Sequence, residues 1–118
     1  MTRGAAVALV QADAGTGKLR SSIVGYVVGR LVSGTSDRTM LGQHGTAGLV
    51  VRSIDEMNYD WPEHALVILC TDGIETRWKP DTVRPILTHD PSVAAATILR
   101  DHSRGRDDAT VLVMQRSA

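Results

Sequence analysis

The feature that most constrains the fold is an unbroken apolar run, residues 65–70, which ends in Thr71-Asp72-Gly73. A run of this length with several β-branched residues predicts a strand buried on both faces. Asp72-Gly73 then predicts a turn where the strand leaves the interior. A half-buried carboxylate becomes neutral unless it has a partner, and a bound cation is one such partner. The run therefore predicts a fixed carboxylate at the mouth of a core.

A second acidic segment, Asp107-Asp108, precedes another largely apolar segment, residues 109–114. If the two strands are antiparallel neighbours, Asp72 and Asp107 lie at the same sheet edge. Two carboxylates about 4 Å apart repel by about 4 kcal/mol at an effective dielectric constant of about 20, and a divalent cation would turn this repulsion into attraction. Oxygen ligands suit Mg²⁺ and Mn²⁺. Taken singly, each motif is also compatible with an ordinary turn or a solvated loop.

Four sequence strings together resemble the metal-dependent protein phosphatases of the type 2C (PPM) superfamily, and most of all its bacterial stage II sporulation protein E-type branch. The resemblance runs in the family's order from about residue 3 to residue 116. The strings are RGAAVALVQAD from residue 3, LGQHGTAG from residue 41, TDGIETRW from residue 71 and SRGRDDATVLV from residue 103. Both acidic motifs are present with the expected flanks.

The resemblance implies hydrolysis of a phosphoserine or phosphothreonine monoester by a metal-activated water, with no protein nucleophile. It implies that Asp72 and Asp107 are ligands of Mn²⁺ or Mg²⁺, and that Asp108 orients the site without ligating. The implied partner is a phosphorylated regulatory protein of the anti-sigma-factor antagonist type. His44 is matched in relatives, and we interpret it as a loop residue near the site.

The chain also departs from the family pattern. The family's first metal motif, an Asp-Gly-x-Gly-His-Gly-like turn followed by a helix, does not occur in these 118 residues. That turn supplies the aspartate that bridges two metals. We therefore expect residues 1–118 to form one domain, the C-terminal portion of a PPM-type phosphatase domain. The competing interpretation is a non-catalytic phosphatase-like remnant that binds a regulatory protein. A second departure is Gly25-Tyr26-Val27, where relatives usually have Gly-Asn-Ile, and the bulkier Tyr26 is expected to change a buried polar contact.

The pattern of the whole chain predicts an α+β fold, a mainly antiparallel β-sheet with a C-terminal helix, corresponding to part of the PPM-type α-β-β-α sandwich. Strands are expected at residues 6–12, 19–26, 30–33 and 49–57, besides the central run. Residues 13–17 predict a hairpin turn. A phosphate-binding loop at residues 14–18 is disfavoured, because Leu19 stands where a Ser or Thr is needed and a strand follows instead of a helix.

One helix is expected near the C-terminus. Asp90 is a good N-cap and Pro91 a good first residue, and Gly105 is expected to end the helix. The inner stripe should contain Ala95, Ile98, Leu99 and His102, with His102 packing or capping the helix end.

Composition excludes several classes of function. Thirteen basic and thirteen acidic residues balance without a basic run, which argues against nucleic-acid binding. Aromatic residues make up only 3% of the chain and Phe is absent, so Val, Leu, Ile and Ala must build the core. A single cysteine, Cys70, excludes an internal disulfide and a zinc cluster, and its apolar neighbours predict a core residue. We expect a cytoplasmic protein without membrane contact, because no apolar stretch reaches spanning length and residues 1–20 lack the order of a signal peptide.

Overall fold

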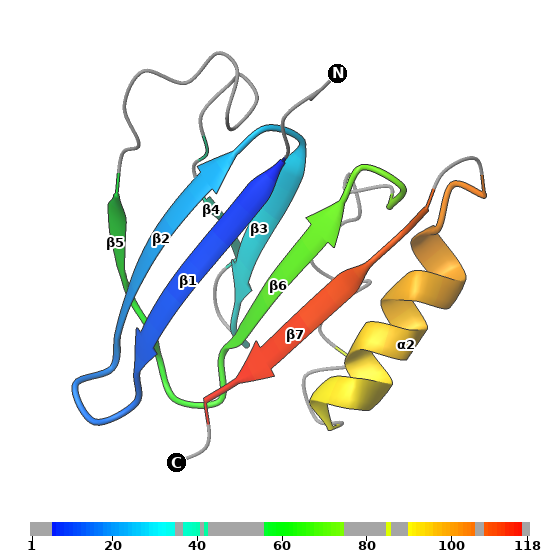
Figure 1. Ribbon diagram of the computed structural model, residues 1–118. Helices are drawn as coiled ribbons and strands as arrows, with labels where there is room; N and C mark the ends of the chain where they lie inside the picture. Colours follow the sequence, from blue (N-terminus) through cyan, green and yellow to red (C-terminus); the bar gives the residue numbers. More distant parts are fainter. Residues whose placement is uncertain are drawn as a thin grey trace.

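The computed structural model describes residues 6–34, 37–40, 42, 56–74, 85, 90–105 and 108–116. Within these residues, two antiparallel sheets face each other and one helix packs beside the second sheet (Figure 1). The first sheet has the order β1-β2-β5, and the second has the order β4-β3-β6-β7. The elements are β1 (Val7–Asp13), β2 (Lys18–Val24), β3 (Val27–Val32), β4 (Asp37–Met40), β5 (Met57–Asp60), β6 (Leu66–Thr71), α2 (Pro91–His102) and β7 (Val111–Gln115). The predicted α+β fold is confirmed.

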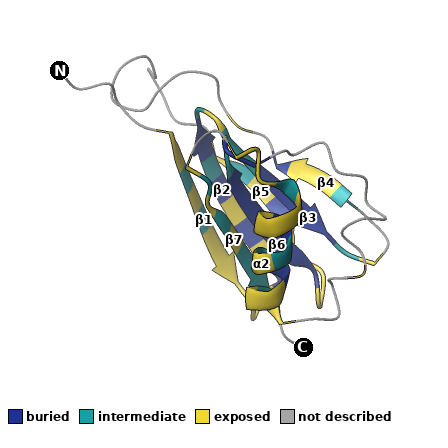
Figure 2. Ribbon diagram, turned by 90° about the vertical axis from the view of Figure 1, so that its right-hand side faces the viewer, coloured by how far each residue is buried: buried dark blue, intermediate teal, exposed yellow. Residues whose placement is uncertain are grey.

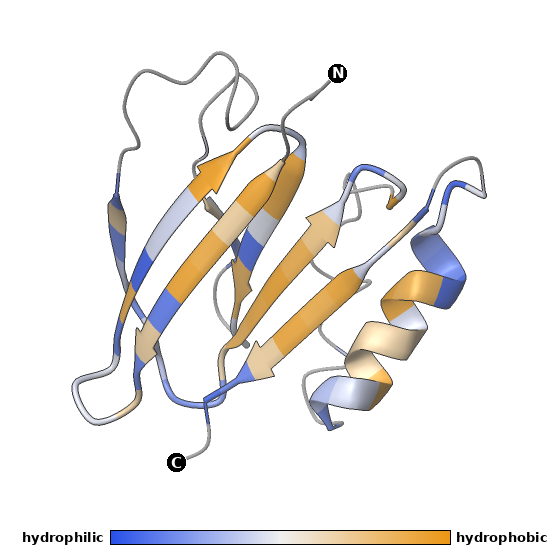
Figure 3. Ribbon diagram, viewed as in Figure 1, coloured by the Kyte–Doolittle hydropathy of each residue, from blue (hydrophilic) through white to orange (hydrophobic). Residues whose placement is uncertain are grey.

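The central strand β6 lies between β3 and β7 and contributes to two cores. Val67 and Leu69 pack into a cluster between the sheets, whereas Leu66, Ile68 and Cys70 pack on the opposite face, towards α2. Hydrophobic residues run along most of β6 and β7 (Figure 3). Burial on both faces confirms the interpretation of the apolar run, because alternate side chains of a strand point to opposite faces.

The cluster between the sheets draws on both layers. Figure 2 shows the buried residues gathered on the strands between the layers, while β1 and the outward side of α2 are mostly exposed. The buried members of the cluster are Leu19, Ile23, Leu31, Met40, Tyr59, Trp61, Ala65, Val67 and Leu69. Aliphatic side chains dominate this list, as the composition requires.

The β1–β2 hairpin is closed by its own turn residues. The Asp13 carboxylate accepts hydrogen bonds from the backbone N–H groups of Gly15 (2.9 Å) and Thr16 (3.2 Å). Gly17 has a φ of 68°, a left-handed conformation that favours glycine, and its N–H donates to the Asp13 carbonyl at 2.8 Å. The chain then continues into a strand. The hairpin prediction is confirmed, and the resemblance to a phosphate loop is superficial.

Helix α2 begins as predicted, with Asp90 at the N-cap and Pro91 as the first residue, although the Asp90 side chain makes no capping hydrogen bond. The buried residues of α2 are Ala94 and Ile98. The predicted stripe is therefore wrong at Leu99, which is 41% exposed. The reason is that Ala94 and Ile98 pack into the cluster that also contains residues of β3 and β6, so this one i, i+4 pair forms the buried face of the helix.

The helix ends earlier than predicted. Its last residue is His102, and Ser103 adopts an extended conformation that forms an antiparallel bridge with Ile74. Gly105, with a φ of 71°, turns the chain two residues later. Tertiary pairing with the segment after β6 thus decides where the helix stops. No helix in the described part of the chain is long and apolar enough to cross a membrane.

Three further expectations concern Tyr26 and two of the predicted strands. Tyr26 is 78% exposed in the β2–β3 turn, so the expectation that it changes a buried polar contact is wrong. The strand expected at residues 49–57 falls almost wholly outside the described residues, and the described strand β5 starts at its last residue, Met57. The expected strand at residues 30–33 is the second half of β3.

Candidate metal centre

The two acidic motifs meet at one edge of the second sheet. β6 and β7 pair antiparallel, with Leu69 opposite Leu112 and Cys70 opposite Val111. The end of β6, which leads into Asp72, therefore lies beside the start of β7. This is the relationship that the sequence predicted for two strands flanked by acids.

Hydrogen bonds between two threonines hold this edge together. The Thr71 N–H donates to the Thr110 carbonyl at 3.1 Å, and the Thr110 N–H donates to the Thr71 hydroxyl oxygen at 2.9 Å. The Thr71 Oγ1 also lies 3.5 Å from the Thr110 carbonyl oxygen. We call this arrangement the Thr71–Thr110 latch. Sequence reasoning overlooked it, although a threonine stands on the strand side of both acidic motifs.

The turn that carries Asp72 sits directly on the second motif. The Ile74 N–H donates to the Thr71 carbonyl at 3.1 Å and closes the turn. A Cβ built at Gly73 would lie 2.4 Å from the Asp108 carbonyl oxygen, so only glycine fits there without a shift of backbone. Sequence reasoning placed Gly73 in a turn but overlooked its close approach to the second acidic motif.

The end of α2 adds a third segment to this edge. The Arg104 N–H donates to the Gly73 carbonyl at 2.8 Å, next to the bridge between Ser103 and Ile74. The turn after β6 therefore contacts Asp108, before β7, on one side and Arg104, after α2, on the other. Backbone hydrogen bonds fix its position.

The structure describes two of the four predicted site residues. Asp72 and Asp108 are both exposed at this edge. Asp107 and His44 lie outside the described residues, so the separation of Asp72 and Asp107 stays a prediction. Within the described ranges, no three His, Cys, Asp or Glu residues form a group that could hold a metal ion. The accessible carboxylates nevertheless fit a hard cation, because Mg²⁺ usually keeps several waters and binds through one or two carboxylates.

Cys70 adjoins the site but takes no part in it. Its side chain is buried in the core that faces α2, and burial raises the pKa of the Cys70 thiol to about 11, with the nearby Arg30 charge partly opposing the shift. A neutral, buried thiol is a poor nucleophile. The prediction of a core cysteine is confirmed.

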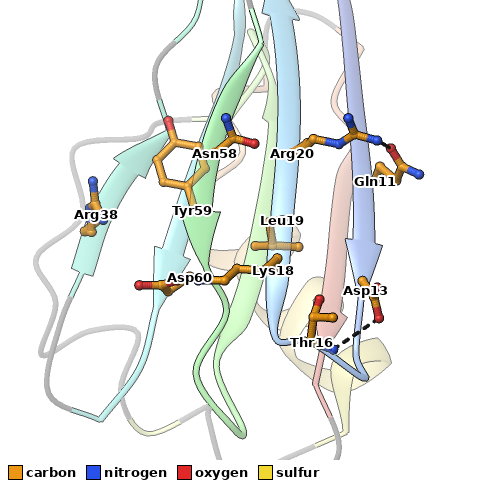
Figure 4. Close-up of a pocket in the computed structure, with 10 residues that line it drawn as sticks. All are labelled: Gln11, Asp13, Thr16, Lys18, Leu19, Arg20, Arg38, Asn58, Tyr59 and Asp60. Carbon is orange, nitrogen blue, oxygen red and sulfur yellow. Dashed lines mark hydrogen bonds and ion pairs between the residues drawn. The ribbon is translucent and has the colours of Figure 1, made fainter.

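A groove of about 540 Å³ lies on the first sheet, around the hairpin end of β2 and β5 (Figure 4). Two of its charged side chains, Lys18 and Asp60, form an ion pair, and the Arg38 guanidinium lies 5.3 Å from the centre of the Tyr59 ring. None of the residues lining it belongs to the acidic edge. The candidate site therefore rests on the edge formed by β6 and β7.

Comparison with known proteins finds solved structures with a similar fold. No family model matches the chain, and no curated protein matches it at the required significance. A chain from the bacterial stressosome superposes with a TM-score of 0.80 at 24% identity, over 98% of this chain and 60% of that one. RsbX in complex with magnesium gives 0.76 at 19% identity, over 98% and 57%. The manganese-soaked phosphatase domain of SpoIIE from Bacillus subtilis gives 0.70 at 16% identity, over 97% and 57%.

The chain spans at most about 60% of the length of these structures. They include PPM-type phosphatases from different systems. The superposition covers nearly all of this chain, so the resemblance found in the sequence is confirmed at the level of structure: the chain has the fold of part of a PPM-type phosphatase domain.

Proposed function

We propose that the chain forms the C-terminal portion of a metal-dependent serine/threonine protein phosphatase domain of the SpoIIE type. The observation that carries the proposal is the joining of the two acidic motifs at one edge by the Thr71–Thr110 latch and the antiparallel β6–β7 pair. Either motif alone is compatible with a turn. Two such motifs, fixed side by side at the end of a buried strand, are suited to ion binding.

In this proposal, Asp72 and Asp107 hold Mn²⁺ or Mg²⁺, and Asp108 orients the segment between them. A bound divalent ion would supply a more acidic water near neutral pH and would neutralise phosphoryl oxygens. The chain's own residues provide two hard oxygen ligands and hold one of them, Asp72, on a turn fixed by backbone hydrogen bonds. No side chain needs to act as a nucleophile.

The proposed substrate is a phosphorylated regulatory protein of the anti-sigma-factor antagonist type, in the cytoplasm. The neighbours support this class: one belongs to the bacterial stressosome, and SpoIIE is a cell fate determinant. The balanced charge of the chain suits a protein partner more than a nucleic acid.

A second candidate is a phosphatase-like remnant that binds a regulatory protein without catalysis. The observation that favours it is the exposed apolar surface of the edge strand β1, where Leu9 is 67% exposed and Val7 is 36% exposed. The two candidates differ in whether Asp72 and Asp107 bind a metal ion.

Titration with Mn²⁺, followed by paramagnetic broadening of backbone amide signals, tests the proposal. A metal site predicts broadening that is strongest at residues 71–74 and 108–110 and falls with distance from them, with a dissociation constant on the order of millimolar, because only two carboxylates take part. D72N and D107N should each abolish this localised broadening. D90N is the control, because Asp90 is an exposed aspartate at the N-cap of α2, and it should leave the broadening unchanged. Broadening that is absent, or spread evenly over surface carboxylates, would favour the remnant.

A further inference from the structure

We infer that Thr71 is a positioning residue, whose hydroxyl group sets the separation of the two acidic motifs and thereby the affinity for the metal ion. The inference rests on the proposed function. It concerns a residue that is neither a ligand nor part of the reaction, and it follows from how the hydrogen bonds of Thr71 are distributed.

In a regular antiparallel ladder, the two opposite residues of each hydrogen-bonded pair exchange both backbone N–H···O=C bonds, and such pairs alternate with pairs that exchange none. Thr71 and Thr110 make only one of these bonds, from the Thr71 N–H to the Thr110 carbonyl at 3.1 Å. The return bond from the Thr110 N–H goes to the Thr71 hydroxyl at 2.9 Å. The side chain thus takes the place of the backbone acceptor at this position of the ladder.

Because the hydroxyl accepts the bond from the Thr110 N–H, the Thr71 carbonyl is available to the turn. The Thr71 carbonyl accepts instead from the Ile74 N–H at 3.1 Å, which closes the turn that carries Asp72. A single residue therefore serves both motifs: its carbonyl holds the turn, and its hydroxyl holds the approach to β7. Without the hydroxyl, the Thr110 N–H would lose its acceptor unless the Thr71 carbonyl released the turn.

The Thr71–Thr110 latch lies close in the sequence to both proposed metal ligands. Thr71 immediately precedes Asp72, and Thr110 follows Asp107 by three residues. Gly73 packs against the Asp108 backbone on the other side of the same turn, so the two segments touch at two points. Loss of one point should let the ligands separate. Partners that orient ligands typically change metal affinity by about 10- to 100-fold when they are removed.

The test compares T71V with T71S in the Mn²⁺ titration. Valine keeps the β-branched shape and removes the hydroxyl, whereas serine keeps the hydroxyl. We expect T71V to raise the dissociation constant by about 10-fold, at the low end of the range for such partners, and T71S to stay within about two-fold of the natural chain. T97V is the matched control, because the Thr97 hydroxyl likewise bonds to the backbone, donating to the Val93 carbonyl at 2.8 Å, but within α2 and away from the acidic motifs. T97V should titrate like the natural chain.

Hydrogen exchange gives a readout without metal. The Thr110 amide should be protected in the natural chain and in T71S, and should exchange faster in T71V. If T71V does not fold, T71A removes the same hydroxyl and supports the same comparison. Unchanged Mn²⁺ affinity in a folded T71V or T71A would overturn the inference while leaving the proposed function intact. Absence of localised Mn²⁺ binding in the natural chain would overturn both.

Discussion

Arg30 and Asp37 form an ion pair across β3 and β4, with only 10% and 7% of their side chains exposed. The Arg30 Nε donates to Asp37 Oδ1 at 2.9 Å, and a second guanidinium nitrogen contacts the other carboxylate oxygen. The pair is therefore bidentate, a geometry that suits the fork of an arginine. It ties the edge strand β4 to the sheet that carries β6.

We expect D37N to destabilise the fold by about 3 kcal/mol, because it removes the carboxylate charge from a buried ion pair. The midpoint of urea unfolding measures the effect. K18A is the control: it breaks the Lys18–Asp60 pair, whose side chains are 64% and 79% exposed, and such pairs contribute little. Equal shifts for D37N and K18A would contradict the distinction between buried and exposed pairs.

Gly73 provides the second prediction. A Cβ at this position would lie 2.4 Å from the Asp108 carbonyl oxygen and 3.0 Å from the Ala109 Cβ, and backbone cannot move aside cheaply. We expect G73A to lower stability by about 1–3 kcal/mol, as overpacking does, and to shift the amide signals of residues 108–110. G34A is the control, because nothing lies within 4 Å of a Cβ built there. Equal stability of G73A and G34A would show that the two motifs are not in close contact.

Much of the fold could be predicted because it depends on local patterns. The apolar run predicted β6 correctly, since burial on both faces leaves no polar position in the strand before Thr71. The Asp13 turn could be predicted for the same reason: its hydrogen bonds join residues only two and three apart.

The remainder depends on contacts between distant segments. The end of α2 is set by pairing of Ser103 with Ile74, and the latch joins Thr71 to Thr110. No local pattern contains such information. The exposure of Leu99 likewise depends on how α2 lies against β7, which helical periodicity does not specify. At the candidate site, the sequence could therefore identify acids but not the groups that hold them in place.

Cys70 provides a third prediction. Burial holds the pKa of its thiol at about 11, above the ordinary range, so the folded state favours the neutral thiol. This contribution to stability is fully present below the pKa of the unfolded thiol and is lost as pH rises through about 11. We expect the urea midpoint of the natural chain to fall between about pH 9 and pH 11 more steeply than that of C70A.

The comparison with C70A isolates the thiol, because other groups that titrate in the same range are present in both proteins. Reaction with a disulfide reagent at pH 8 gives a second measurement, which should be slow in the folded protein and fast in urea. Parallel pH profiles for the two proteins would show that the thiol is not buried as described.

The last prediction concerns activity. The 118-residue chain should release little or no phosphate from p-nitrophenyl phosphate, because hydrolysis depends on accurate placement of water against phosphorus and the bridging aspartate of the first motif does not occur in the chain. A version extended at its N-terminus by the Asp-Gly-x-Gly-His-Gly-like turn and its helix should gain Mn²⁺-dependent turnover. D72N or D107N should abolish that turnover while leaving the fold intact, because each change keeps side-chain size and removes charge. D90N serves again as the control and should remain active. Turnover that survives in both D72N and D107N would mean that these two residues do not hold the metal, whatever the fold of the domain.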